Sequence, residues 1–141
     1  MNRIKWCLEQ KKGIELVEPN DNLCKAYFKE AEDTLSCIDP KNEKWALIMA
    51  YYACYNSLYA ILMKAGIKCE IHDCTLKLMK LITDFGEDDH KLLSGLKDKR
   101  IQNQYYLKRM PLTELSSVQD FFLKCKKVAL NIDVEKLRGM L

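Results

Sequence analysis

The heptapeptide RIQNQYY, which begins at Arg100, combines side chains that could bind a phosphate-bearing ligand. On a helix, Arg100 and Gln104 lie one turn apart and face the same way, with Asn103 beside them. The guanidinium of Arg100 is a permanent planar donor that can hold phosphate through two nitrogens. Tyr105 or Tyr106 could stack on a base or donate a hydroxyl, and the two amides could donate or accept hydrogen bonds. The alternative is that Arg100 pairs with a carboxylate and that the tyrosines are half-buried packing residues.

A second group of candidate residues lies in the hexapeptide CEIHDC, which begins at Cys69. Cys69, His72 and Cys74 could supply three ligands of a tetrahedral zinc site. However, the segment lacks a C-x-x-C pair, and Cys74 falls on the apolar face of its helix, where a packing role suffices. We therefore expect no metal and no cofactor, and we interpret His72 as a helix-start residue that could point into a cleft.

The remaining histidine, His90, follows Asp88 and Asp89. It could transfer a proton, because an unperturbed imidazole titrates near neutrality. The simpler interpretation is a solvated residue in the first turn of a helix. The sequence suggests neither a nucleophile beside a base nor a glycine-rich phosphate loop, so we assign no catalytic residue.

The formal net charge of +3 is too small to require a polyanionic partner. The positive charge is nevertheless concentrated in one part of the chain. Six residues together have a net charge of +4, which leaves −1 for all the others: Lys97, Asp98, Lys99, Arg100, Lys108 and Arg109. Such a cluster can steer a phosphate-bearing ligand, although on a helix it is more often a solvated face.

Seven cysteines are many for 141 residues, and their odd number argues against a framework of disulfides. The first ten residues are polar and charged, without the apolar core of a secretory signal. We therefore expect reduced thiols in a cytoplasmic protein, most of them filling core positions as small hydrophobic side chains.

The elements that must position these residues are helices, and the most distinctive one runs from about residue 42 to 65. It contains 19 consecutive uncharged residues, a length that could cross a bilayer. Its tyrosines, however, are spread through the middle of the run, whereas tyrosines of membrane helices prefer the interfaces. We therefore expect the buried central helix of a soluble bundle and no membrane partner. One face carries small side chains and another carries tyrosines: Ala46, Ala50, Ala53, Ser57 and Ala60, and Tyr52, Tyr55 and Tyr59, respectively.

Apolar periodicity and the positions of glycine and proline predict further helices on both sides of the central one. Their approximate ranges are 4–11, 22–37, 72–85, 89–107 and 113–131, followed by a short tail helix. No strand, internal repeat or low-complexity tract is evident. The prediction is an all-α fold, a four- to five-helix up-and-down bundle that forms one domain over residues 1–141.

Several of these segments resemble the HEPN (higher eukaryotes and prokaryotes nucleotide-binding) family of small helical domains, in particular its prokaryotic stand-alone branch. The central helix has the YYA core of that family at residues 51–53. Arg100 and Tyr105 have the spacing of the family's R-x-x-A-D-Y pattern. Residues 26–35 partly match its early A-x-x-x-L-x-x-A-E-x-x-L helix, and His72 resembles a histidine that frequently follows the central helix.

The resemblance covers about residues 22–130 and implies a HEPN-like bundle that dimerises. Such domains often pair with a minimal nucleotidyltransferase, as in toxin–antitoxin modules. Ribonuclease members carry an arginine and a histidine on one helix, in an R-x(4–6)-H pattern. Here the matching window ends in two tyrosines, no histidine follows Arg100, and Asn103-Gln104 replaces the usual Ala-Asp. The resemblance therefore does not imply ribonuclease activity through that motif.

The leading hypothesis is a homodimeric, HEPN-like module that binds a nucleotide, RNA or a partner nucleotidyltransferase, and that is not an enzyme. Its candidate binding residues are His72, Arg100, Asn103, Gln104, Tyr105 and Tyr106. One alternative is a divergent metal-independent ribonuclease, in which Arg100 holds the scissile phosphate and His72 or Tyr105 has the catalytic role. Another is a purely structural interaction protein whose stripe of small residues forms the contact.

Overall fold

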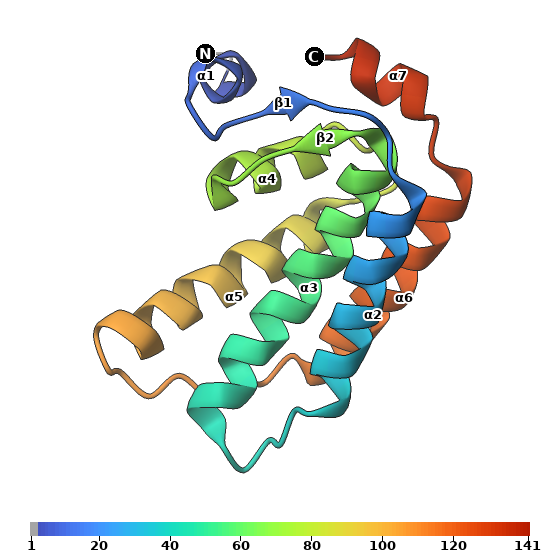
Figure 1. Ribbon diagram of the computed structural model, residues 1–141. Coiled ribbons are helices and arrows are strands. Elements are labelled where there is room, and N and C mark those ends of the chain that lie inside the picture. Colours follow the sequence, from blue (N-terminus) through green and yellow to red (C-terminus); the bar gives the residue numbers. More distant parts are fainter. Residues whose placement is uncertain (1–2) are drawn as a thin grey trace.

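The computed structural model describes residues 3–141, so Met1 and Asn2 of the expected domain lie outside the described residues. This part of the chain is mostly helical, as the sequence predicts. The four long helices pack side by side, and the short elements gather at one end of them (Figure 1). In chain order the elements are α1 (Arg3–Glu9), β1 (Glu15–Leu16), α2 (Asp21–Ser36), α3 (Glu43–Ala65), β2 (Ile67–Lys68), α4 (His72–Met79), α5 (Glu87–Tyr105), α6 (Leu115–Asn131) and α7 (Val134–Gly139).

Helix α3 is the centre of the fold, and it lies between α2, α5 and α6 (Figure 1). By length and composition it could cross a membrane, but 83% of its most apolar window is buried inside the fold. Its stripe of small residues, Ala46 to Ala60, is at most 1% exposed. Because neighbouring helices of the same chain cover this stripe, it cannot form the contact of a purely structural interaction protein. The choice left open by the sequence is thus resolved in favour of packing within the chain.

The C-terminal end of α3 is fixed by a backbone crossing, where the chain at Val17 passes close to Gly66. Gly66 caps this helix in the left-handed region, at φ +71°, where glycine is strongly favoured. A Cβ atom at this position would collide with the carbonyl oxygen of Val17. From α7, Arg138 Nη1 donates hydrogen bonds to the carbonyl oxygens of Val17, Ala65 and Gly66 at 2.8, 3.0 and 2.8 Å. The C-terminal helix is thereby tied to the centre of the bundle.

The small sheet contradicts the prediction that the chain has no strand. β1 and β2 are antiparallel, with Glu15 opposite Lys68 and Leu16 opposite Ile67. Each strand has only two residues, too few for an alternating pattern to be visible in sequence. The pairing results from the crossing at the end of α3, where the amide of Val17 donates to the carbonyl of Gly66 at 2.8 Å.

Helix α4 is shorter than predicted: it ends at Met79 rather than near Phe85. Three-residue turns follow the helix, with amides of Lys80, Leu81 and Ile82 donating to carbonyls three positions earlier. Such turns keep the apolar side chains pointing inward, and both Ile82 and Phe85 are buried. The apolar periodicity therefore continued beyond the regular helix.

The expectation of reduced thiols is wrong for one pair of cysteines. Cys7 of α1 and Cys74 of α4 form a disulfide, and both are completely buried. Sequence spacing could not indicate this pair, because 67 positions separate its members. The other five cysteines are free, and four of them are buried, as expected for small hydrophobic side chains: Cys24, Cys54, Cys69 and Cys125.

Candidate functional site

Helix α5 places Arg100 against the aromatic face of α3. The guanidinium carbon lies 4.9 Å from the ring centre of Tyr51 and 5.5 Å from that of Tyr52, within cation–π range. Its Nη1 donates to the hydroxyl of Tyr52 at 3.3 Å and to Oε1 of Gln104 at 3.1 Å. The side chains that surround Arg100 are thus aromatic or neutral and polar.

The positive charge of Arg100 has no carboxylate partner among residues 3–141. Every ion pair in this part of the chain involves a lysine rather than Arg100. Arg100 is nevertheless only 8% exposed, and its buried Nε has no hydrogen-bond partner. The alternative interpretation of the sequence, in which Arg100 pairs with a carboxylate, is therefore wrong. Such an arrangement is unusual, because buried charges are ordinarily paired.

Helix α4 brings His72 to the same tyrosines. His72 Nδ1 and the Tyr51 hydroxyl are hydrogen-bonded at 2.7 Å, and the imidazole stacks on the ring of Tyr55 with 4.1 Å between centres. Burial lowers the pKa of His72, and the positive charges of Arg100 and Lys97 lower it further. His72 is therefore neutral at physiological pH, with one ring nitrogen that donates and one that accepts; Nδ1 is used by Tyr51, which leaves Nε2 for a ligand. We refer to Tyr51, Tyr52, His72, Arg100 and Gln104 as the Arg100 cluster.

A hollow lined by tyrosines adjoins the Arg100 cluster. It has a volume of about 340 Å³, and it shares Tyr52 and His72 with the cluster. Its other lining residues are Tyr27, Tyr55, Asn56, Tyr59, Lys68, Cys69 and Glu70. Several of the rings are ordered by contacts with one another: Tyr55 stacks on Tyr59 with 6.0 Å between ring centres, and Tyr27 meets Tyr59 edge-on at 5.0 Å. A flat ligand could stack on such walls.

Hydrogen bonds hold the walls of the tyrosine hollow from behind. The Tyr55 hydroxyl lies 3.0 Å from Thr75 Oγ1, and the Tyr59 hydroxyl accepts from the amide of Cys69 at 3.0 Å. Burial raises the pKa of Tyr55 and of Tyr59, so both hydroxyls are protonated. The hollow is thus an uncharged aromatic surface at physiological pH, apart from Lys68 and Glu70.

Among the residues predicted for binding, the structure brings together Arg100, Gln104 and His72. Asn103 is not part of this group. It is 4% exposed, and its side-chain amide both donates to the carbonyl of Met110 at 3.2 Å and accepts from that residue's backbone amide at 2.9 Å. Asn103 therefore fastens the loop that follows α5.

Tyr105 and Tyr106 are not part of the Arg100 cluster in the described residues. Each is 66% exposed, and within residues 3–141 no hydrogen bond or ring contact joins either of them to Arg100. They are therefore not the half-buried packing residues of the sequence alternative. Tyr51, which the sequence assigned only to the YYA core, and Tyr52, which it also placed in the tyrosine stripe, contact Arg100 instead. The tyrosine stripe of α3 was the available signal, since buried tyrosines on one face need partners for their hydroxyls.

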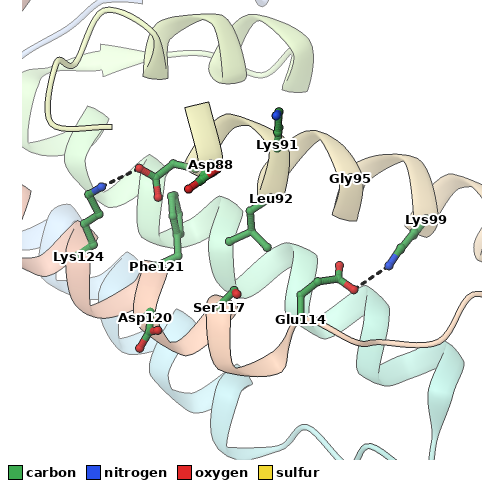
Figure 2. Close-up of a pocket in the computed structure, with 11 residues that line it drawn as sticks. Asp88, Lys91, Leu92, Gly95, Lys99, Glu114, Ser117, Asp120, Phe121 and Lys124 are labelled. Atoms are coloured by element: carbon green, nitrogen blue, oxygen red, sulfur yellow. Dashed lines mark hydrogen bonds and ion pairs between the residues drawn. The ribbon is translucent and has the colours of Figure 1, made fainter. Parts of the chain in front are cut away.

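A larger cavity, with a volume of about 480 Å³, lies elsewhere, between α5 and α6. Figure 2 shows its apolar floor of Leu92 and Phe121 and two ion pairs at its edges. These pairs join Lys124 to Asp89 and Lys99 to Glu114, each at 2.7 Å. The cavity shares no residue with the Arg100 cluster. These two pairs use four of its seven charged lining residues and leave Asp88, Lys91 and Asp120 outside the ion pairs of the described residues. None of these three is a buried charge of the kind that Arg100 is.

The described residues contain no group of three or more histidine, cysteine or acidic side chains that could hold a metal ion. In particular, Cys74 is bonded to Cys7, so it has no thiolate to offer alongside Cys69 and His72. His90 lines a different hollow from the Arg100 cluster, together with Asp73 and Lys80.

Comparison with known proteins adds no relative. No family model, curated protein or solved structure matches this chain. Its function must therefore be inferred from the arrangement of its own residues.

Proposed function

We propose that this protein is a helical binding module for a nucleotide or a short segment of RNA. Arg100 holds a phosphate of the ligand, and the tyrosine hollow receives a base. The observation that carries this proposal is the burial of Arg100 without a carboxylate partner. A guanidinium removed from water without a counter-charge costs free energy, which an anionic ligand would recover.

The neighbours of Arg100 support an anionic ligand rather than a cationic one. His72 is neutral because burial and the positive charges of Arg100 and Lys97 lower its pKa, so it adds no charge of its own. Within residues 3–141, Asp73 is the one carboxylate that influences both His72 and Tyr51, and it is already paired with Lys97. The hydrogen bond from Lys97 lowers the pKa of Asp73, which keeps this pair ionised. The potential at the cluster therefore stays positive.

The tyrosine hollow supports a nucleotide rather than inorganic phosphate alone. Tyr52 both accepts a hydrogen bond from Arg100 and lines the hollow, so a phosphate at Arg100 would place an attached base close to the stacked rings. Aromatic side chains bind bases of any sequence by stacking. In the hollow, Asn56 could add hydrogen bonds to a base edge.

We extend the proposal to the wider assembly that the HEPN resemblance implies. On this view the chain is a HEPN-like homodimer, works beside a nucleotidyltransferase in a toxin–antitoxin-type system, and is cytoplasmic. The support is the YYA core and the arginine of the family pattern, which in this chain contact each other through Tyr51, Tyr52 and Arg100. Light scattering and co-purification with a neighbouring nucleotidyltransferase would test this extension.

Fluorescence anisotropy of a labelled single-stranded RNA, with nucleoside phosphates and inorganic phosphate as competitors, tests the binding site. Arg100→Gln should weaken RNA binding by roughly tenfold or more, because charge-assisted hydrogen bonds to phosphate are lost. Arg109→Gln is the matched control, since Arg109 is exposed and outside the cluster. Equal effects of the two substitutions would reject the site and leave only general electrostatic attraction.

A second candidate function is metal-independent cleavage of RNA. The observation in its favour is that Arg100 and His72, from different helices, contact the same two tyrosines. An arginine on the scissile phosphate and a neutral imidazole that takes the proton of the 2′-hydroxyl would be a minimal ribonuclease pair. Of the two catalytic candidates, His72 is favoured over Tyr105, which is 66% exposed and has no hydrogen bond or ring contact with Arg100 in the described residues.

Incubation of the pure protein with mixed RNA in EDTA distinguishes cleavage from binding. A ribonuclease should lose activity in Arg100→Ala and in His72→Ala, whereas His90→Ala should keep it. Cleavage that survives both substitutions would come from a contaminant, and no cleavage above background would leave the binding function.

A further inference from the structure

The end of α5 and the loop after it form a second exposed surface, separate from the Arg100 cluster. Figure 1 shows this segment as an outer end of the molecule, away from the sheet and from α7. Its aromatic and aliphatic side chains are among the most exposed in the described chain: Tyr105 and Tyr106 at 66%, and Leu107 at 77%. Lys108 and Arg109 follow directly and are exposed as well. We refer to residues 105–109 as the tip.

The backbone of the tip is strained at Leu107, an apolar residue. Leu107 has φ +55°, in the left-handed region that favours glycine. It occupies the position just after the helix cap, where the amide of Lys108 returns to the carbonyl of Gln102 at 3.0 Å. Glycine would fit here without strain, and Leu107, at 77% exposed, buries little apolar area that could offset the strain. The choice of leucine is therefore unexplained by folding.

The tip is also held in place, because Asn103 fastens both polar backbone atoms of Met110. The loop is thereby fixed on one side by the helix cap and on the other by this amide. An exposed apolar surface of fixed shape pays little ordering entropy when it binds.

Positive charge surrounds the tip. From Arg100 to Thr113 the sequence has no acidic residue. The turn before α3 and the first residues of that helix add lysines to the same side, since Lys41 and Lys44 line one surface hollow together with Arg109 and Met110. Glu43 is the one acidic residue of that hollow. Beside it, Trp45 is half-exposed under the Lys44 ammonium, which lies 5.3 Å from the ring centre.

We propose that the tip inserts into the surface of an anionic lipid bilayer. Tyrosine and tryptophan favour the headgroup region, leucine reaches the acyl boundary, and lysine and arginine bind anionic headgroups. A single-stranded nucleic acid would use the cations and tyrosines but would gain nothing from Leu107, the residue for which the backbone is strained. The sequence led us to expect no membrane partner because the apolar α3 is buried; the tip is a peripheral contact that needs no spanning helix.

Co-sedimentation with vesicles tests this proposal, using phosphatidylcholine alone and phosphatidylcholine with about 30% phosphatidylserine. Binding should occur with the anionic vesicles and fall as salt is raised. Replacing both Lys108 and Arg109 by glutamine should weaken it by about 25-fold, at roughly fivefold for each cation. Leu107→Ser should weaken it by roughly tenfold through lost apolar burial.

Leu130→Ser is the matched control, because Leu130 of α6 is 79% exposed but lies outside the tip. It should leave vesicle binding unchanged. Leu107→Gly is a second test variant that relieves the strained φ, so loss of binding in that variant cannot be due to unfolding. Leu107→Ser should also leave RNA binding at the Arg100 cluster unchanged, which separates a failure of this proposal from a failure of the proposed function.

Three outcomes would overturn the inference. The first is no binding to either vesicle. The second is equal binding to neutral and anionic vesicles. The third is anionic binding that Leu107→Ser and Leu107→Gly leave intact, which would indicate electrostatic adsorption without insertion.

Discussion

His72 is surrounded by groups that oppose its protonation. Burial, followed by the positive charges of Arg100 and Lys97, lowers its pKa, and only Asp73 acts in the opposite direction. An unfolded histidine takes up a proton near pH 6.5, whereas His72 in the fold does so only at lower pH. Between the two pKa values the unfolded state therefore binds more protons, so the free energy of unfolding decreases as the pH falls through this window.

This linkage predicts a pH dependence that belongs to His72. The contribution of His72 to the free energy of unfolding, measured with urea, should be constant above about pH 7 and should decrease below about pH 6.5. In His72→Gln that loss should disappear, while His90→Gln should retain it. An unchanged pH profile in His72→Gln would show that the imidazole is not held neutral by its surroundings.

Most substitutions destabilise a protein, but a glycine at position 107 should stabilise this one. Because its φ of +55° suits glycine, Leu107→Gly should raise the free energy of unfolding by about 1 kcal/mol. The measurement is urea unfolding at neutral pH, with Leu130→Gly as the control. Since Leu130 lies within α6, glycine there should destabilise the protein by roughly 1 kcal/mol. A loss of stability in Leu107→Gly would mean that the leucine packs against the fold.

At the residue scale, helical spacing predicted some contacts and not others. It predicted that Arg100 and Gln104 face the same way, and their hydrogen bond at 3.1 Å confirms it. The same spacing placed Asn103 beside them, but a side chain one position from Gln104 points about 100° around the helix and meets Met110 instead. That partner belongs to an irregular loop, whose path no periodicity describes.

At the scale of elements, α4 connects the candidate site to the N-terminus. One side of this short helix is bonded to α1 through Cys74 and Cys7. The other side supplies His72 to Tyr51 and Thr75 to Tyr55. An eight-residue helix has little stability of its own, so its position depends on these attachments.

Removal of the disulfide should therefore affect both stability and the site. Cys7→Ser together with Cys74→Ser should lower the free energy of unfolding by about 3 kcal/mol, since the bond closes a long loop in the unfolded chain. RNA binding should weaken because α4 no longer holds His72 firmly. Cys37→Ser, at the exposed free cysteine, is the control.

The same bond can be checked by counting thiols. Labelling of the denatured, unreduced protein should modify five cysteines, and labelling after treatment with a dithiol should modify all seven. Seven labelled thiols without reduction would contradict the disulfide, and with it the attachment of α4 to α1.

The long helices were predictable because a continuous apolar face requires many residues in regular order. α3 is the clearest case, since its uncharged run matches the buried segment closely. β1, β2 and the end of α4 were not predictable, because they depend on contacts between segments distant in sequence. The crossing of Val17 and Gly66 and the bond between Cys7 and Cys74 are such contacts.

At the scale of the whole molecule, α3 serves the core and the site at once. Its small-residue stripe, around Ala53, lets neighbouring helices approach closely. Its tyrosine stripe faces α4 and α5, where the Arg100 cluster and the tyrosine hollow lie. The rigidity of the most buried helix is thereby passed to the residues proposed to bind the ligand.

A substitution of Arg100 can distinguish a residue that stabilises the fold from one that serves ligand binding. Its buried charge has no carboxylate partner and its Nε no acceptor, so the folded state bears a desolvation cost. Arg100→Met keeps much of the side-chain length and apolar packing but removes the charge. It should therefore leave the free energy of unfolding unchanged or raise it by about 1 kcal/mol, despite the loss of the hydrogen bonds to Tyr52 and Gln104.

The same variant should abolish RNA binding, so RNA should raise the Tm of the unaltered protein but not that of the variant. Calorimetry with and without RNA measures both quantities in one experiment. A purely structural arginine would give the opposite result, a loss of roughly 2 kcal/mol or more in Arg100→Met, because its removal would leave its partners unsatisfied. A stable variant that binds nothing would identify Arg100 as a residue retained for its ligand at the expense of the fold.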